Sequence, residues 1–202
     1  MKQNSHVIGI IGGAGTGKTY MSKYLVEKLD AMFIEGDQVA HELLMSEAII
    51  KKIRAYFGDS VVENGIINRS KLGKIVFSDK QSLLALNKIM HGDMFKMIEE
   101  KIITTDKKYI ILEAAVMIEA GFSKLVHTMV CLNAHRDIRL ERLIASRSID
   151  YKKAESILMS QRDDYADYAD YIFDTSEGID YIKSHLEEML NEIREADYEK
   201  NN

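Results

Sequence analysis

A glycine-rich segment near the start of the chain constrains the fold more than any other feature of the sequence. Residues 12–19 read Gly-Gly-Ala-Gly-Thr-Gly-Lys-Thr and satisfy the pattern G-x-x-x-x-G-K-[ST] at every position. The apolar run at residues 6–11 precedes this segment, and a helical pattern follows it at residues 19–29. A strand, a glycine-rich turn and a helix in this order predict a phosphate-binding loop at the edge of a sheet.

The residue types in the loop suit a nucleoside triphosphate. Glycines allow successive backbone N–H groups to turn toward a phosphate, Lys18 offers a cation to the β- and γ-phosphates, and the Thr19 hydroxyl suits Mg²⁺. The third glycine of a G-x-G-x-x-G dinucleotide fingerprint is missing, and so is a guanine-reading N-K-x-D segment. We therefore expect ATP and Mg²⁺ as cofactors, with Thr19 as the metal ligand. The nucleotide-binding residues are expected to be Gly13, Ala14, Gly15, Thr16, Gly17, Lys18 and Thr19.

Five short apolar runs predict the strands of the sheet, at residues 6–11, 32–34, 109–112, 128–132 and 171–173. Most are apolar on both faces, which is typical of a parallel sheet covered by helices on both sides. A clear amphipathic helix is predicted over residues 179–193. The fold class is therefore α/β, a three-layer P-loop kinase fold with a parallel five-stranded sheet.

Two excursions interrupt the alternation of strands and helices. Residues 37–105 are too long for one crossover and carry several periodic apolar segments, so they predict a helical insertion that holds an acceptor. Residues 136–168 are rich in arginine and lysine and predict a lid that closes over ATP. The nucleotide-binding core is then expected to comprise residues 1–36 and 106–202.

Composition narrows the expected partners. The net charge of -5 does not favour binding to the negatively charged backbone of a nucleic acid. No apolar run reaches the roughly 20 residues that are needed to cross a bilayer. The single cysteine, Cys131, lies in an apolar run and suits a reducing compartment. We expect a cytoplasmic protein that acts on a small molecule, without nucleic acid or membrane, as a monomer or weak homo-oligomer.

Two acidic residues are candidates for chemistry. Asp37 follows the second strand, where a carboxylate can accept the proton of an attacking hydroxyl, and it could also cap the helix that follows. Glu113 ends the third strand and could reach a metal through water, or could be an ordinary surface glutamate. After the fifth strand, residues 175–178 lie where this architecture could touch adenine.

With these residues in place, the sequence resembles the dephospho-coenzyme A kinase family over about residues 6–190. The loop resembles I-G-L-T-G-G-I-G-S-G-K-S, and residues 35–41 (Glu-Gly-Asp-Gln-Val-Ala-His) resemble D-A-D-x-x-[AS]-[RH]. Further matching segments are residues 56–58 and 64–72, which include Asn68-Arg69, residues 86–91, which end at His91, residues 113–119, which end at Glu119, residues 139–143 and residues 160–161.

The resemblance implies an enzyme that transfers the γ-phosphoryl group of ATP to the ribose 3′-hydroxyl of dephospho-coenzyme A. In that reading Asp37 is the general base, and Lys18 binds phosphate. Arg69, His91 and Glu119, together with Asp37, are expected to bind the acceptor. Arg142 resembles the lid arginine that neutralises charge on the transferring group.

The sequence departs from the family pattern at several positions. Gly36 replaces the middle alanine of D-A-D, and Gly92 follows His91 where the family has proline. Many members place a second lid arginine four residues after the first. Here that position is Ser146, and Arg147 follows one residue later, about 100° further around a helix.

Two other functions stay open at this level. One is a kinase for another small acceptor, such as a nucleoside monophosphate. The other is a nucleotide-binding regulatory module without catalysis.

Overall fold

The computed structural model describes residues 5–200 of the 202-residue chain, apart from the side chains of residues 179, 197, 199 and 200. Its main sheet has five parallel strands in the order β2-β5-β1-β6-β7. They are β1 (His6–Ile11), β2 (Met32–Glu35), β5 (Tyr109–Glu113), β6 (Thr128–Asn133) and β7 (Tyr171–Asp174). All five predicted strands and the three-layer P-loop fold are confirmed.

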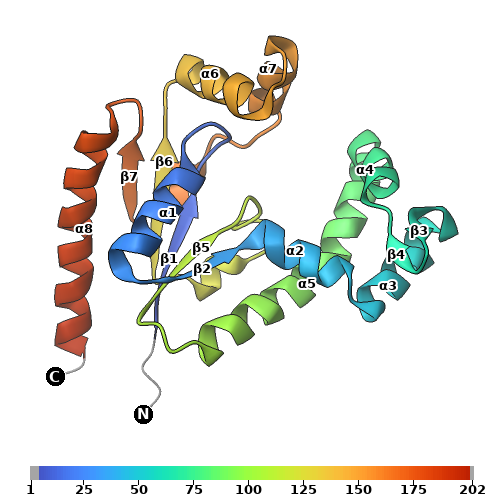
Figure 1. The fold of residues 1–202 in the computed structure, drawn as a ribbon, viewed down its shortest axis with the longest axis horizontal. Helices are drawn as coiled ribbons and strands as arrows, with labels where there is room; N and C mark the ends of the chain where they lie inside the picture. The colour runs from blue at the N-terminus through green and yellow to red at the C-terminus, as the bar shows by residue number, and fades with distance from the viewer. Residues whose placement is uncertain (1–4, 201–202) are drawn as a thin grey trace.

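Helices cover both faces of the sheet, as the doubly apolar strands require. One face packs against α1 (Lys18–Leu29) and α8 (Ile179–Lys200), through residues such as Leu25 and Leu186. The other face packs against the helices of the insertion between β2 and β5, where Ile98 is fully buried. Figure 1 shows α1 in front of the central strands and α8 beside β7. The amphipathic helix predicted over residues 179–193 continues to Lys200.

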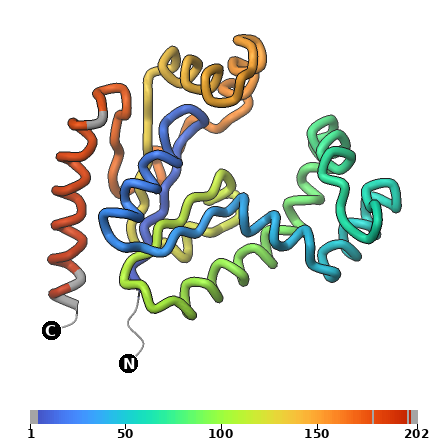
Figure 2. Tube along the Cα trace, in the orientation of Figure 1, coloured from blue at the N-terminus to red at the C-terminus, as the bar shows by residue number. Residues whose placement is uncertain are grey.

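The insertion leaves the sheet between β2 and β5. It contains α2 (Gly36–Leu44), α3 (Glu47–Phe57), the 3₁₀ turn η1 (Asp59–Val61), the short strands β3 (Val62–Glu63) and β4 (Ile66–Ile67), α4 (Arg69–Ser78) and α5 (Lys80–Thr104). Asn64 and Gly65 join β3 to β4 with φ values of 51° and 81°, as a two-residue hairpin turn with φ positive at both positions requires. The tube in Figure 2 shows this lobe extending away from the sheet.

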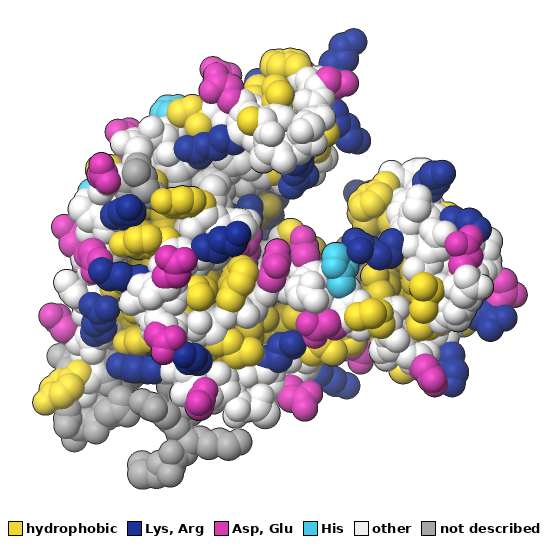
Figure 3. Space-filling model, viewed as in Figure 1, with side chains coloured by type: hydrophobic (Ala, Val, Ile, Leu, Met, Phe, Trp, Pro, Cys, Tyr) yellow, Lys and Arg dark blue, Asp and Glu magenta, His cyan; other side chains and the backbone are white. Residues whose placement is uncertain are grey.

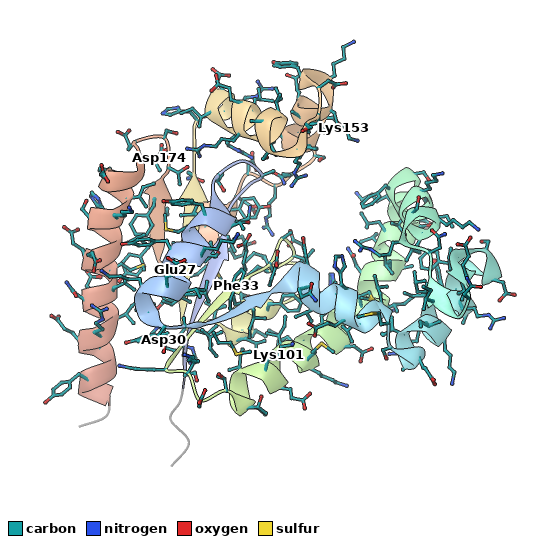
Figure 4. The ribbon with its side chains drawn as sticks, viewed as in Figure 1. Glu27, Asp30, Phe33, Lys101, Lys153 and Asp174 are labelled. Carbon is teal, nitrogen blue, oxygen red and sulfur yellow. The ribbon has the colours of Figure 1, made fainter. Side chains whose placement is uncertain are left out.

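A second, smaller group of helices follows β6. It consists of α6 (Arg136–Arg147) and α7 (Tyr151–Met159), followed by the 3₁₀ turn η3 (Tyr165–Tyr168). Leu140, Leu143 and Ala154 form a small apolar core together with Ala14 of the glycine-rich loop, so these helices are packed directly on that loop. Figure 4 marks their outer end by Lys153 and the end of the neighbouring β7 by Asp174. We call residues 136–168 the lid; its boundaries and the domain boundaries given above stay predictions.

The remaining element, the 3₁₀ turn η2 (Phe122–Leu125), connects β5 to β6. None of the described helices combines the length and the hydropathy needed to span a bilayer.

Candidate active site

The glycine-rich loop joins β1 to α1 in a conformation that only glycine adopts readily. Gly12, Gly15 and Gly17 have φ values of 138°, 79° and 87°. Among the described residues, the backbone N–H groups of Gly15, Gly17 and Lys18 donate to no protein acceptor. Gly17 and Lys18 lie at the N-terminus of α1, where the helix dipole also favours an anion. The loop therefore has the form of a phosphate cradle.

Lys18 folds back over this cradle. Its Nζ donates hydrogen bonds to the carbonyl oxygens of Gly12 and Gly13, at 2.8 Å and 2.9 Å. Burial lowers the pKa of Lys18, while the charge of Glu113 raises it. A partly desolvated ammonium group held by two neutral carbonyls is well placed to exchange them for the oxygens of a phosphate.

The lid packs so closely on the loop that side chains at Gly13 and Gly15 would collide with it. Arg139 of α6 donates from Nε to the carbonyl oxygen of Ala14 at 2.9 Å, and Gln161 accepts from the backbone N–H of Ala14 at 2.7 Å. A Cβ added at Gly13 would lie 2.1 Å from Nη2 of Arg139, and one at Gly15 would lie 2.5 Å from its carbonyl oxygen. The lid thus holds the outer side of the loop in place.

A cavity of about 820 Å³ opens on the other side of the loop. Its walls come from the loop and α1, from the C-terminal ends of β2 and β5, and from lid helix α6. The space-filling view in Figure 3 shows the surface hollowed between the lid and the insertion, with Lys and Arg side chains on the underside of the lid. The lining includes Ala14, Gly15, Gly17, Lys18, Thr19, Tyr20, Glu35, Asp37, Glu113, Arg142, Ser146, Arg147 and Gln161.

Asp37 lines this cavity together with the loop. Helix α2 begins at Gly36, so Asp37 lies within its first turn and does not cap the helix. The side chain is exposed, and no hydrogen bond or ion pair joins it to another described residue. Gly36 lets α2 approach the strand end closely, because a Cβ there would lie 2.7 Å from the Cβ of Ala114. This close contact fixes where Asp37 emerges.

Glu113 and Thr19 form the part of the cavity that fits a divalent cation. The Thr19 hydroxyl donates to one carboxylate oxygen of Glu113 at 3.1 Å, and the Ser22 hydroxyl donates to the other at 2.8 Å. The described residues contain no cluster of three or more His, Cys, Asp or Glu residues that would hold a metal ion by themselves. Mg²⁺ is commonly bound by one or two protein oxygens together with substrate phosphates, so this oxygen-rich pair fits it.

Arg142 lies at the edge of the cavity, with its guanidinium already engaged. Nη1 donates to Oγ1 of Thr175 at 2.7 Å and to the carbonyl oxygen of Gly15 at 3.3 Å, and Nη2 donates to the carbonyl oxygen of Thr175 at 2.9 Å. Beside it is a second cavity of about 470 Å³, lined by Gly17, Tyr20, Met21, Arg142, Thr175, Gly178 and Ile182. Arg142 therefore ties the loop to the segment that follows β7.

The three predicted acceptor residues of the insertion and the β5 turn lie outside the lining of the larger cavity. Arg69 is exposed at the start of α4, and His91 is half-buried on α5. Burial lowers the pKa of His91, and the negative charge of Glu119 opposes that shift. Glu119 itself forms an ion pair with Arg162, with 2.9 Å between Oε1 and Nη1. Binding of the acceptor by these residues stays a prediction.

Sequence reasoning missed two side chains that shape the site. Ser22 is three residues after Thr19 on α1, so the helical period alone could have placed both hydroxyls on one face. Arg136, Arg139 and Arg142 are three residues apart, a spacing that is also typical of a solvated helix face, so the sequence did not favour a functional role for Arg139. Its contact with Ala14 joins residues 125 apart in the sequence and has no local signal.

Comparisons with known proteins agree with this geometry. The sequence model of the family described as dephospho-CoA kinase matches residues 6–180. The chain is 33% identical over 159 residues to the dephospho-CoA kinase of Fusobacterium nucleatum, covering 77% of this chain and 80% of that protein.

Solved structures show the same fold. A Thermus thermophilus protein has a TM-score of 0.78 at 21% identity, with 94% of this chain and 98% of that chain covered. The dephospho-CoA kinase of Campylobacter jejuni has a TM-score of 0.66 at 20% identity, with 96% and 98% covered. From the family match, the sequence relative and the phosphate cradle together, we conclude that this chain belongs to the dephospho-CoA kinase family.

Proposed function

We propose that this protein transfers the γ-phosphoryl group of ATP to the ribose 3′-hydroxyl of dephospho-coenzyme A, releasing ADP and coenzyme A. Family membership supports the reaction class and the use of ATP. The observation that carries the proposal is that one cavity is lined both by a phosphate cradle with Lys18 and by the carboxylate of Asp37, which no described residue pairs. A kinase needs these two features on opposite sides of the transferred group.

The loop and α1 are the proposed binding site for the triphosphate. Backbone N–H groups at the start of α1 donate hydrogen bonds to the phosphate oxygens, and Lys18 leaves the carbonyls of Gly12 and Gly13 to neutralise the phosphate charge. The smaller cavity beside Tyr20 and Thr175 adjoins the loop and is the proposed site of the base. Because Arg139 and Gln161 already hold the outer side of the loop, little reorganisation is needed when the phosphates bind.

Asp37 is the proposed general base. It accepts the proton of the acceptor hydroxyl as the oxygen attacks, and because no described residue donates a hydrogen bond to it, its carboxylate is available for that hydroxyl. Thr19 and Glu113 are the proposed protein side of a Mg²⁺ site. When bound, Mg²⁺ would reduce the negative charge of the phosphates and help to orient them.

The lid and the insertion exclude water from the reaction in this proposal. Water competes with the acceptor hydroxyl, so a kinase of this kind must cover its site before transfer. The lid packs on the loop through Ala14, and the insertion begins at Gly36, next to Asp37. Both are therefore joined directly to the parts of the site that they would cover. The proposed enzyme acts in the cytoplasm, as a monomer or weak homo-oligomer.

One assay tests the acceptor. Purified protein with ATP and Mg²⁺ is given dephospho-coenzyme A, a set of nucleoside monophosphates or no acceptor, and ADP release is followed. We expect dephospho-coenzyme A alone to accelerate release, with coenzyme A as the product. Acceleration by a nucleoside monophosphate alone would overturn the proposal, and ATP binding without turnover on any acceptor would indicate a regulatory module.

A further inference from the structure

The arginines of lid helix α6 differ in how far their guanidinium groups are already used. Arg139 donates to Ala14 and Gln161, and Arg142 donates to Gly15 and Thr175. Arg147 is exposed and lines the larger cavity, yet its guanidinium has no hydrogen bond, ion pair or ring contact with any residue that the structure describes. Of these three arginines, only Arg147 has a guanidinium group that forms no hydrogen bond with a described residue.

The one-residue offset noted in the sequence does not turn Arg147 away from the site. Two neighbouring rows of α6 line the cavity, one formed by Arg142 and Ser146 and the other by Leu143 and Arg147. Residues four apart lie on the same face of a helix, so Arg147 belongs to the same cavity-lining row as Leu143. Leu143 is 2% exposed and packs with Ala14 of the loop, so this row of α6 faces the loop.

Electrostatics also connect Arg147 with the phosphate cradle. Burial lowers the pKa of Lys18 most, and the positive charges of Arg139 and Arg147 lower it further, against the opposing effect of Glu113. Two cations that repel one another across a cavity become favourable when a polyanion lies between them. Helix α6 ends at Arg147, and Ser148 follows with φ of 51°, so the guanidinium is also at the favourable C-terminal end of the helix dipole.

We propose that Arg147, and not Arg142, is the lid residue that contacts the transferring phosphoryl group, while Arg142 positions the loop and the segment after β7. This proposal rests on the proposed function. In the transfer, the acceptor oxygen bonds to the γ-phosphorus and its proton passes to Asp37. The bond from the γ-phosphorus to the β–γ bridging oxygen breaks, and its electron pair leaves with ADP. Arg147 then offsets the negative charge on the transferred group.

The central test compares Arg147→Ala with Lys153→Ala, which removes an exposed lid cation outside the cavity lining. We expect Arg147→Ala to lower kcat about 10²- to 10³-fold, with the Kd for ATP and the Tm nearly unchanged. Lys153→Ala should match the wild type. Exogenous guanidinium should restore part of the activity of Arg147→Ala, which a merely structural role would not predict.

A swap variant tests the offset itself. Ser146→Arg combined with Arg147→Ser keeps the composition and moves the arginine about 100° around the helix. If the Leu143 row is the productive one, the swap should not restore kcat above that of Arg147→Ala by more than about threefold. Wild-type activity in the swap, or an Arg147→Ala kcat within about threefold of wild type, would overturn the assignment.

A binding measurement separates this proposal from the proposed function. The complex of ADP with aluminium fluoride mimics a transferring phosphoryl group and can be titrated without any acceptor. Arg147→Ala should weaken its binding at least tenfold while leaving ADP affinity unchanged. Equal affinity in both proteins would refute the role of Arg147. Tight binding by the wild type without transfer to dephospho-coenzyme A would refute the acceptor instead.

Discussion

Alanine substitutions at two glycines of the loop should differ in cost, because only one of them faces the backbone of the lid. Gly15 and Gly17 have φ values of 79° and 87°, so alanine at either position adopts a left-handed conformation at a cost of about 1–2 kcal/mol. A Cβ at Gly15 would also lie 2.5 Å from the carbonyl oxygen and 2.9 Å from the Cα of Arg139. A Cβ at Gly17 would have only one neighbour within 4 Å, the side-chain atom Nη1 of Arg142 at 4.0 Å.

The clash at Gly15 involves main-chain atoms of α6, which cannot rotate away as a side chain can. Overpacking of this kind adds about 1–3 kcal/mol. We therefore expect Gly15→Ala to lower the free energy of unfolding by about 2–5 kcal/mol and Gly17→Ala by about 1–2 kcal/mol. Equilibrium unfolding in urea, with the slope of the transition checked for each protein, measures the difference.

Gly13→Ala provides an internal control, because its Cβ would meet the flexible end of Arg139, with Nη2 at 2.1 Å. Truncation of that side chain in Gly13→Ala/Arg139→Ala should remove the clash and leave the loss of the Arg139 hydrogen bonds. The same truncation should not relieve Gly15→Ala. If Gly15→Ala and Gly17→Ala unfold at the same urea concentration, the lid is not packed on the loop as described, and the reasoning fails.

Three further predictions concern single groups around the cavity. Glu113→Gln should raise the Mg²⁺ concentration needed for half-maximal rate about tenfold at saturating ATP; an unchanged Mg²⁺ titration would exclude Glu113 from the metal site. Gly36→Ala should cost about 1–3 kcal/mol in urea unfolding because of its contact with Ala114, and equal stability would contradict that packing. Burial raises the pKa of the Cys131 thiol from 9.0 to about 11. Between these pH values the thiol ionises only in the unfolded chain, so the free energy of unfolding falls as pH rises. Iodoacetamide at pH 8 should accordingly label Cys131 only after unfolding, and labelling of the native protein at the unfolded rate would contradict its burial.

The fold could be predicted from the sequence because its signals are local. The strands of a covered parallel sheet are continuous apolar runs, and the loop motif fixes the connection from β1 to α1. The insertion was harder to divide into helices. Its periodic segments at residues 83–90 and 94–103 belong to one 25-residue helix, α5, which passes through Gly92 without a break. A proline there would have removed a backbone donor and clashed with the preceding turn, and glycine does neither.

The site could be predicted only in part, because some of its contacts join residues that are far apart in the sequence. Lys18 and Thr19 follow the loop after β1, and Asp37 follows β2. The C-terminal ends of these parallel strands lie at one edge of the sheet, so topology alone brings the three residues together. The roles of the lid arginines depend on contacts between residues more than 100 positions apart in the chain, such as the hydrogen bond from Arg142 to the carbonyl oxygen of Gly15. A sequence pattern identifies the helix that carries these arginines. It does not tell which guanidinium groups the protein itself uses.

The most direct test of the account is the substitution Asp37→Asn, measured for turnover and for ATP binding on the same protein. The change keeps the size of the side chain and removes its capacity to take a proton. We predict that kcat with dephospho-coenzyme A falls 10²-fold or more, while the Kd for ATP stays within about threefold of the wild-type value. A variant that keeps its turnover within about threefold would contradict the assignment of Asp37 as the base and, with it, the reading of the cavity.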